Sequence, residues 1–184
     1  MARLFLENGL EINDFDAVAT AAAALGITLV RRPVPTDAPL QALLGQDALT
    51  PEENAQVLTS MGDFITHEQA HHGVTAWDLV VLHPGIPDLD TKLATFARPH
   101  IHTDDEVRYV LAGEGVFGVV SPDGQQVELQ VDAQEYIRVP AGTQHWFRMT
   151  PLRRIQCIRT FAGPPTWEAV FTDTSIRLGP LAGA

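Results

Sequence analysis

The chain has 184 residues, a length that usually forms one domain with a proper hydrophobic core. Its formal net charge of −11 argues against a nucleic-acid partner, because nonspecific binding of nucleic acid depends on lysines and arginines that neutralise phosphates. Hydrophobic residues make up 45% of the chain, yet no apolar run approaches the roughly 20 residues that a membrane span needs, and the start lacks the pattern of a secretory signal. We therefore expect a single-domain, cytoplasmic protein without a nucleic-acid or membrane partner, and we further expect a monomer. The only cysteine, Cys157, cannot form an internal disulfide and is more typical of a buried small hydrophobic residue.

Residues 1–75 are expected to be largely helical. Asn13 or Asp14 can cap a first helix that reaches Leu25 and stops at the glycine after it. The proline-rich residues 32–39 that follow are expected to form a loop rather than a domain boundary.

A stronger helix signal begins at Thr50. It combines a capping threonine, proline at the first helical position and Glu53 three residues after the cap. Apolar residues recur from there at spacings of three and four, so one helix is predicted as far as Gly73.

Residues 76–172 change to short strands separated by turns. The predicted strands are rich in β-branched and aromatic residues, and they are Val107–Leu111, Gly115–Val120, Gln125–Val131, Glu135–Val139, His145–Met149 and Ile155–Phe161. Residues 112–115, 121–124 and 140–143 contain the Gly, Pro and Asp typical of tight turns. This spacing predicts a mainly β domain, a sandwich or small barrel of the jelly-roll kind with helices packed outside, followed by a C-terminal tail at residues 173–184.

Four residues form a candidate metal site. Side chains at positions i and i+2 of a strand leave the same face, so His100 and His102 can share one ion, and Glu106 has the same parity. A second strand that follows the Pro-x-Gly turn could bring His145 to that face. Three imidazoles and one carboxylate suit Fe(II), Ni(II), Mn(II) or Zn(II), and they leave about two positions free on a six-coordinate ion. The alternative is surface histidines and a solvated carboxylate, which the His-x-His pair alone does not exclude.

The same residues carry a resemblance to a known family. The His-x-His pair, the Glu with a following Gly, and Pro-x-Gly-x-x-His resemble the two motifs of the cupin superfamily. Within it, residues 100–108 and 139–147 resemble the acireductone dioxygenases of methionine salvage, and the resemblance extends over roughly residues 60–175. It implies a cupin β-barrel that binds one Fe(2+) or Ni(2+) per chain through His100, His102, Glu106 and His145.

The resemblance also implies a reaction. Its substrates would be dioxygen and the acireductone 1,2-dihydroxy-3-oxo-5-methylthiopentene. In the family, the iron form gives 4-methylthio-2-oxobutanoate and formate, whereas the nickel form gives 3-methylthiopropanoate, carbon monoxide and formate. The protein ligands are the same for both metals, so the sequence does not decide between the two sets of products.

Further site residues are expected beside the metal. Arg108 shares the parity of the ligands, and Arg159 lies in an apolar strand; a buried guanidinium needs a carboxylate or an anionic ligand. By the resemblance, Asp105 helps to form the substrate dianion, although a turn-forming aspartate explains it equally well. The resemblance also implies three cavity-lining aromatic residues, Phe147, Phe161 and Trp167. Aromatic residues in strands are equally consistent with plain core.

Two alternatives stay open, and a third is disfavoured. The first is another cupin metalloenzyme, which would keep the four ligands but should not need Asp105, Arg108 and Trp167 together. The second is a noncatalytic small-molecule-binding cupin. The third is a zinc protease, because His67-Glu-Gln-Ala-His71 fits its H-E-x-x-H signature. That segment lies near the end of the predicted helix, where histidines are favoured by the helix dipole, so the protease is disfavoured. Pro99 stands where the family often has a glutamate suggested to help metal incorporation, and it leaves metal loading undecided.

Overall fold

The structure, a computed structural model, describes residues 1–163 and 168–179. In chain order its elements are β1 (Arg3–Leu6), β2 (Glu11–Ile12), α1 (Phe15–Ala24), β3 (Thr28–Arg31), α2 (Ala38–Leu44), α3 (Pro51–Ser60), α4 (Gly62–His72), β4 (Ala76–Leu82), α5 (Leu89–Phe96), β5 (His100–Ile101), β6 (Glu106–Val120), β7 (Gln126–Asp132), β8 (Glu135–Val139), β9 (His145–Met149), β10 (Ile155–Phe161) and β11 (Val170–Phe171). Among these helices, none has the length and apolar character that a membrane crossing requires.

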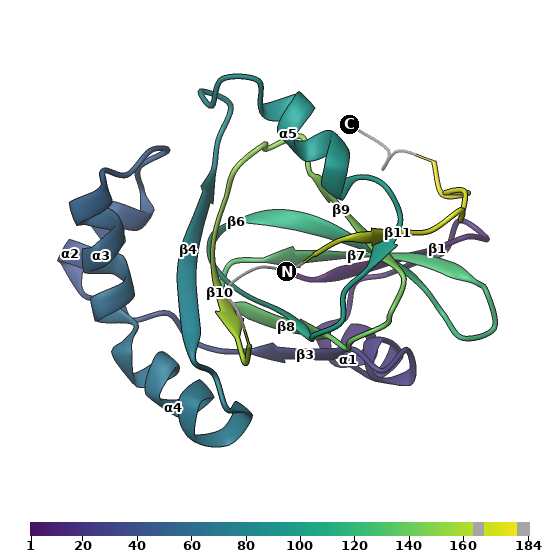
Figure 1. The fold of residues 1–184 in the computed structure, drawn as a ribbon, viewed down its shortest axis with the longest axis horizontal. Helices are drawn as coiled ribbons and strands as arrows, with labels where there is room; N and C mark the ends of the chain where they lie inside the picture. Colours follow the sequence, from purple (N-terminus) through teal and green to yellow (C-terminus); the bar gives the residue numbers. More distant parts are fainter. Residues whose placement is uncertain (164–167, 180–184) are drawn as a thin grey trace.

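The long strand β6 connects the two parts of the sheet (Figure 1). Its first half pairs with β8 and β10, which continue to β3 and β4. Its second half pairs with β7 and β9, which continue to β1, β2, β5 and β11. Every pairing is antiparallel, and the strands of the described ranges do not close into a complete ring. The mainly β, jelly-roll-type prediction is confirmed, with an open edge rather than a closed barrel.

The turn predicted at residues 112–115 is wrong, because β6 continues through it. Gly113 has φ +76, and the register of β10 against β6 shifts between Gln156 and Cys157. A Cβ atom on Gly113 would lie only 2.1 Å from the carbonyl oxygen of Arg154, so glycine alone fits here. The bulge leaves Leu111 without a register partner on β10, and the positive φ of Gly113 follows it where β6 passes from one half of the sheet to the other.

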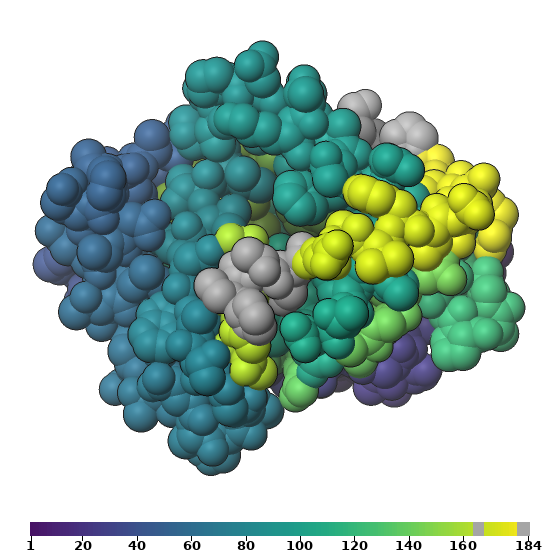
Figure 2. Space-filling view, in the orientation of Figure 1, coloured from purple at the N-terminus to yellow at the C-terminus, as the bar shows by residue number. Residues whose placement is uncertain are grey.

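Helices α2, α3 and α4 cover the outer face of the half that contains β4, β8 and β10 (Figure 1). Buried residues of these helices, including Leu40, Val57 and Phe64, pack against sheet residues such as Tyr109 and Ile158. In the space-filling view they form the blue flank of the molecule, and the yellow C-terminal segment lies against the teal middle of the chain (Figure 2). The predicted outer packing of the N-terminal helices is confirmed.

The N-terminal part differs from the prediction in detail. The capping box of Thr50 and Glu53 is present, and so is the Asp14 cap of α1. The single helix predicted up to Gly73 is instead two helices, because Met61 (φ −97, ψ 16) leaves the helical region and Gly62, a weak helix former, follows it.

Several short elements were missed by the sequence analysis. The strands β1 and β3 pair with β7 and β8, so residues 1–75 contribute strands as well as helices. Helix α2 begins inside the proline-rich segment, where Asp37 caps it and Pro39 occupies its first turn. Helix α5 was also missed, and it covers the cavity described below.

Candidate metal centre

The four predicted ligands converge, with their ligand atoms within 4.8 Å of one another and all four residues buried. His100 and His145 are direct register partners on β5 and β9. His102 follows β5, and Glu106 begins β6 after a short bend. The ligands therefore come from β5, the segment after it, β6 and β9, so His100, His102 and Glu106 do not lie on one continuous strand.

Each imidazole is oriented by a backbone carbonyl. The Nδ1 atoms of His100, His102 and His145 lie 2.7, 2.9 and 2.8 Å from the carbonyl oxygens of Arg98, Glu168 and Thr143. When Nδ1–H donates to a carbonyl, the lone pair of the neutral ring is on Nε2. This arrangement presents the nitrogen that a metal would use.

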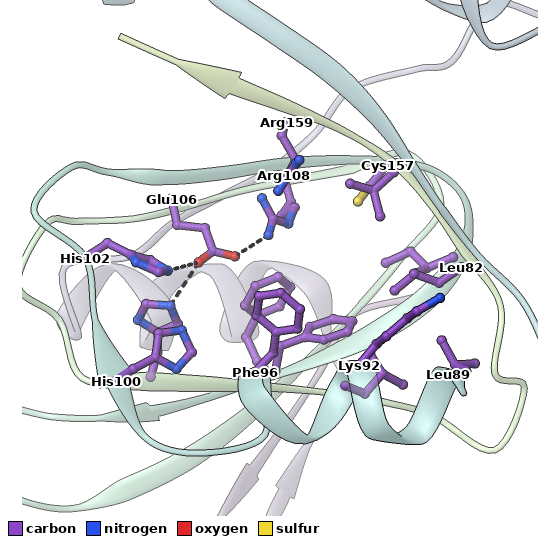
Figure 3. Close-up of a pocket in the computed structure, with 16 residues that line it drawn as sticks. Leu82, Leu89, Lys92, Phe96, His100, His102, Glu106, Arg108, Cys157 and Arg159 are labelled. Atoms are coloured by element: carbon purple, nitrogen blue, oxygen red, sulfur yellow. Dashed lines mark hydrogen bonds and ion pairs between the residues drawn. The ribbon is translucent and has the colours of Figure 1, made fainter. Parts of the chain in front are cut away.

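The carboxylate of Glu106 lies at the centre of the group (Figure 3). Its Oε2 is 3.2 Å from Nε2 of His102 and 2.9 Å from Nε2 of His145, while its Oε1 is 3.0 Å from Nη2 of Arg108. Burial by itself raises the pKa of Glu106, but Arg108 and the hydrogen bonds from the two histidines hold this pKa well below its usual value. The centre therefore contains a carboxylate anion.

The histidine pKa values respond to the same surroundings. Burial lowers the pKa of His100. Burial also acts to lower the pKa of His102, yet its hydrogen bonds with Glu106 and with the Glu168 carbonyl leave that pKa raised. The two histidines differ because His102 contacts the Glu106 carboxylate directly at 3.2 Å, and a hydrogen-bonded anion favours the imidazolium form.

This donor set fits a divalent transition metal. The Nε2 atoms of His102 and His145 lie 3.2 and 2.9 Å from one carboxylate oxygen of Glu106. Because the Nδ1 partners of both rings are carbonyls, either Nε2 protons or a metal ion must lie between the nitrogens and this oxygen, and a divalent ion can take the place of the protons. Three nitrogens and one oxygen match the preferences of Fe(II), Ni(II) and Zn(II). His100, His102, Glu106 and His145 would hold such an ion.

A cavity of about 340 Å³ adjoins the centre. The ligands and two arginines form one end, and the close-up shows Leu82 and Leu89 at the other (Figure 3). The remaining wall is largely apolar and includes Phe117, Phe147 and Cys157. The cavity therefore offers polar groups and positive charge next to the metal ligands, and a mainly apolar surface further away, where Lys92 also lies beside Leu82 and Leu89 (Figure 3).

Both predicted arginines line this cavity and both have carboxylate partners. Arg108 contacts Glu106, and Arg159 forms a two-point ion pair with Asp78 in which Nε lies 2.7 Å from Oδ1. Burial alone would lower the pKa of Arg159, but the hydrogen bonds and charge of Asp78 outweigh burial and raise this pKa, so the guanidinium stays charged.

The predicted aromatic residues have different positions. Phe147 lines the cavity, with its ring 5.3 Å from that of Phe117. Phe161 is 2% exposed and lies beneath the guanidinium of Arg159. It is not among the described residues that line the cavity. Trp167 lies outside the described residues.

Asp105 is not brought to the metal ligands. Its carboxylate accepts hydrogen bonds from Nε of Arg138 (2.5 Å) and from the backbone N–H of Ala141 (2.9 Å), and it lines a second cavity of about 270 Å³. Its predicted part in forming the substrate dianion stays a prediction.

Helix α5 supplies cavity residues that the sequence analysis missed. Leu89, Lys92, Leu93 and Phe96 all line the cavity, and Lys92 is the only lysine of the chain. The spacing of four and three between Leu89, Leu93 and Phe96 is the signal that could have predicted an amphipathic helix here.

The H-E-x-x-H segment does not form a comparable site. His67 and His71 lie at the exposed end of α4 with their rings stacked at 4.3 Å. Glu68, which would act as the base of a protease, is fully buried, and it accepts a hydrogen bond from the Tyr136 hydroxyl and pairs with Arg32. This geometry contradicts the protease alternative.

A jelly-roll sheet that gathers three histidines and a glutamate beside a cavity defines the class, a cupin with a metal site. Comparison with known proteins agrees. The model of the ARD/ARD' family matches residues 42–169, and the chain belongs to this family.

Relatives and a solved structure support this membership. An acireductone dioxygenase of Microcystis aeruginosa is 45% identical over 181 residues, which cover 98% of each chain. An acireductone dioxygenase of Trichodesmium erythraeum is 37% identical over 177 residues, covering 96% of this chain and 98% of the relative. The structure of acireductone dioxygenase from Bacillus anthracis with a cadmium ion in its active center has a TM-score of 0.85 and 27% identity, and the match covers 93% of this chain and 98% of that one.

Proposed function

We propose that this protein is a metal-dependent dioxygenase that cleaves the acireductone 1,2-dihydroxy-3-oxo-5-methylthiopentene with O2 in methionine salvage. The observation that carries the proposal is the buried group of His100, His102, Glu106 and His145 at the polar end of a cavity. Family membership and relatives of nearly equal length support the same activity. A bound Fe(2+) or Ni(2+), one per chain, would supply Lewis acidity and a template for the substrate oxygens.

The cavity residues have separate parts in this proposal. Arg108 lies beside the ligands and would offset the negative charge of the enediolate. Arg159, held in place by Asp78, adds a second positive charge on the same wall. Leu82, Leu89 and Phe147 form apolar surface suited to the methylthio end of the substrate, and their burial of that end excludes water.

Metal reconstitution tests the proposal. Metal-free protein receives Fe(II) or Ni(II), and the acireductone is added under air while its ultraviolet absorbance, oxygen uptake, formate and carbon monoxide are followed. The iron form should give formate and 4-methylthio-2-oxobutanoate, and the nickel form should give formate, carbon monoxide and 3-methylthiopropanoate.

Two outcomes decide against it. No turnover above the metal-free control with either metal would contradict the proposed activity, and binding of the substrate without turnover would favour a noncatalytic cupin. The expected monomeric state and cytoplasmic location stay predictions, which gel filtration and cell fractionation test.

A further inference from the structure

The metal centre is built from two segments that are far apart in the sequence. One runs from His100 to Glu106, and the other from Arg138 to His145. Backbone contacts join them, since the N–H of Gly142 donates to the carbonyl of His102 at 2.9 Å and Glu106 pairs with Val139 in the sheet. The ligand geometry therefore depends on how these segments are held together.

The side chain of Asp105 makes further connections between the same segments. Its Oδ1 accepts from the N–H of Ala141 at 2.9 Å, and its Oδ2 accepts from Nε of Arg138 at 2.5 Å. A second guanidinium nitrogen, Nη2, contacts the same Oδ2. Arg138 lies in β8, and Ala141 lies in the turn after β8 that leads to His145.

Asp105 faces away from the metal cavity. Adjacent residues in extended chain point to opposite sides, so the Glu106 carboxylate faces the ligands while the Asp105 carboxylate faces the second cavity with Arg138 and Ala141. The Asp105 and Arg138 side chains are 30% and 37% exposed, so their charge attraction is screened and contributes little to the stability of the fold. What the contacts provide is a fixed distance between two backbone segments.

We propose that Asp105 is a positioning residue that ties the bend between His102 and Glu106 to the turn before His145, and so holds the two halves of the metal centre in register. Arg138 and the Ala141 N–H are its partners in this contact. The proposal requires that the four residues bind a metal, but it does not depend on the acireductone reaction.

The dissociation rate of nickel tests this role apart from catalysis. The full chain is loaded with Ni(II), and metal release to an excess of chelator is followed for the wild type, Asp105→Asn, Arg138→Gln and the double variant. Outer contacts that orient metal ligands change affinity by about 10- to 100-fold, so each single variant should release nickel about tenfold faster. Because the two side chains act through one contact, the double variant should release nickel no more than about twofold faster than the faster single variant.

Two further variants complete the design. Asp105→Ala also removes the acceptor for Ala141 and should release nickel faster than Asp105→Asn. Glu7→Gln removes a carboxylate that pairs with Arg177 at 2.5 Å, away from the cavity residues, and should leave the rate unchanged. Far-ultraviolet circular dichroism checks folding. If Asp105→Ala does not fold, the nearly isosteric Asp105→Asn and the shorter, uncharged Arg138→Gln still decide.

Nickel release within about twofold of the wild type in Asp105→Asn and Arg138→Gln would overturn the proposal. A lower kcat for Asp105→Asn, with unchanged nickel release and no effect of Arg138→Gln, would instead assign Asp105 to proton transfer. Single effects that multiply in the double variant would show that the two residues act independently, which also contradicts the proposal. If the wild type binds nickel but does not turn over the acireductone, only the proposed function fails.

Discussion

The described residues contain two groups of histidines, which differ in their burial and in the groups that surround their rings. In the buried centre, three imidazoles share a carboxylate, and each Nδ1 contacts a backbone carbonyl. In the helix-end cluster, formed by His67, His71 and His72, the rings are exposed and His67 and His71 stack on each other. Among the described residues, only the buried centre brings three or more metal-ligating atoms together. Orientation by neighbouring groups, more than sequence spacing, makes a site.

The two glutamates of these groups show the same contrast. Glu106 presents its carboxylate to two imidazoles and to Arg108. Glu68 is equally buried, but only one imidazole contacts it, Nδ1 of His67 at 3.3 Å. Its other partners are the Tyr136 hydroxyl at 3.2 Å and Arg32 at 3.4 Å, which connect α4 to the sheet. The Glu106 carboxylate therefore belongs to the candidate metal site, whereas the Glu68 carboxylate holds α4 against the sheet.

The largest effect is expected from the ligands of the buried centre. Glu106→Ala should weaken metal binding by more than the roughly 10- to 100-fold that outer contacts contribute, because it removes a direct ligand. Isothermal titration with Ni(II) measures this. His102→Ala should behave similarly, and His71→Ala is the matched control that should keep one metal per chain. Normal metal occupancy in both Glu106→Ala and His102→Ala would refute the ligand set.

Arg108 distinguishes the chemistry of the buried centre from simple metal binding. Arg108→Met should lower kcat/KM for the acireductone by about 100-fold, because it removes a preorganised positive charge beside the substrate site. Metal content should fall much less than in Glu106→Ala. Arg177→Met, which removes a surface guanidinium, is the control. Equal activity of the two arginine variants would show that Arg108 does not act on the substrate.

Glu68, which lies beside the helix-end cluster, is expected to stabilise the packing of α4 against the sheet. Glu68→Ala should reduce the free energy of unfolding by roughly 2 kcal/mol, because Tyr136 and Arg32 lose a charged hydrogen-bond partner. Urea denaturation measures the change, and the metal content per chain should stay constant. A loss of metal without a loss of stability would instead make this cluster a metal site.

The smallest effect concerns Cys157 in the cavity wall. Burial raises the pKa of this thiol to about 11, whereas an unfolded thiol ionises near 8.5. Between these values the unfolded chain binds fewer protons, so the thiol contributes stability at lower pH that is lost as the pH rises toward 11. At pH 9.5 the loss should be roughly 1 kcal/mol, and Cys157→Ala should lack this component. An identical pH dependence in both proteins would show that the thiol is not buried.

The ligand set was predictable from sequence because His-x-His, Glu and Pro-x-Gly-x-x-His restrict which side chains can meet. The route by which they meet was not, since β5 ends at Ile101 and its pairing with β9 depends on contacts distant in sequence. The effect of Gly113 was also hidden. A glycine with positive φ suits a turn as well as a bulge, and only the approach of Arg154 decides between them.

Residues outside the motifs were harder to predict. Helix α5 is short, and its apolar spacing covers only Leu89, Leu93 and Phe96, so the pattern that could predict it is brief. The direction of Asp105 depends on Arg138 and Ala141, which lie more than thirty residues away. Local sequence thus identified the groups that carry the chemistry, while long-range packing determined which of them face the cavity.

Anomalous diffraction from crystals of the nickel-loaded protein tests the central claim most directly. The account predicts one nickel peak per chain, about 2.1 Å from the Nε2 atoms of His100, His102 and His145 and from an oxygen of Glu106. The principal peak between His67 and His71, or no peak among the four buried ligands, would contradict it.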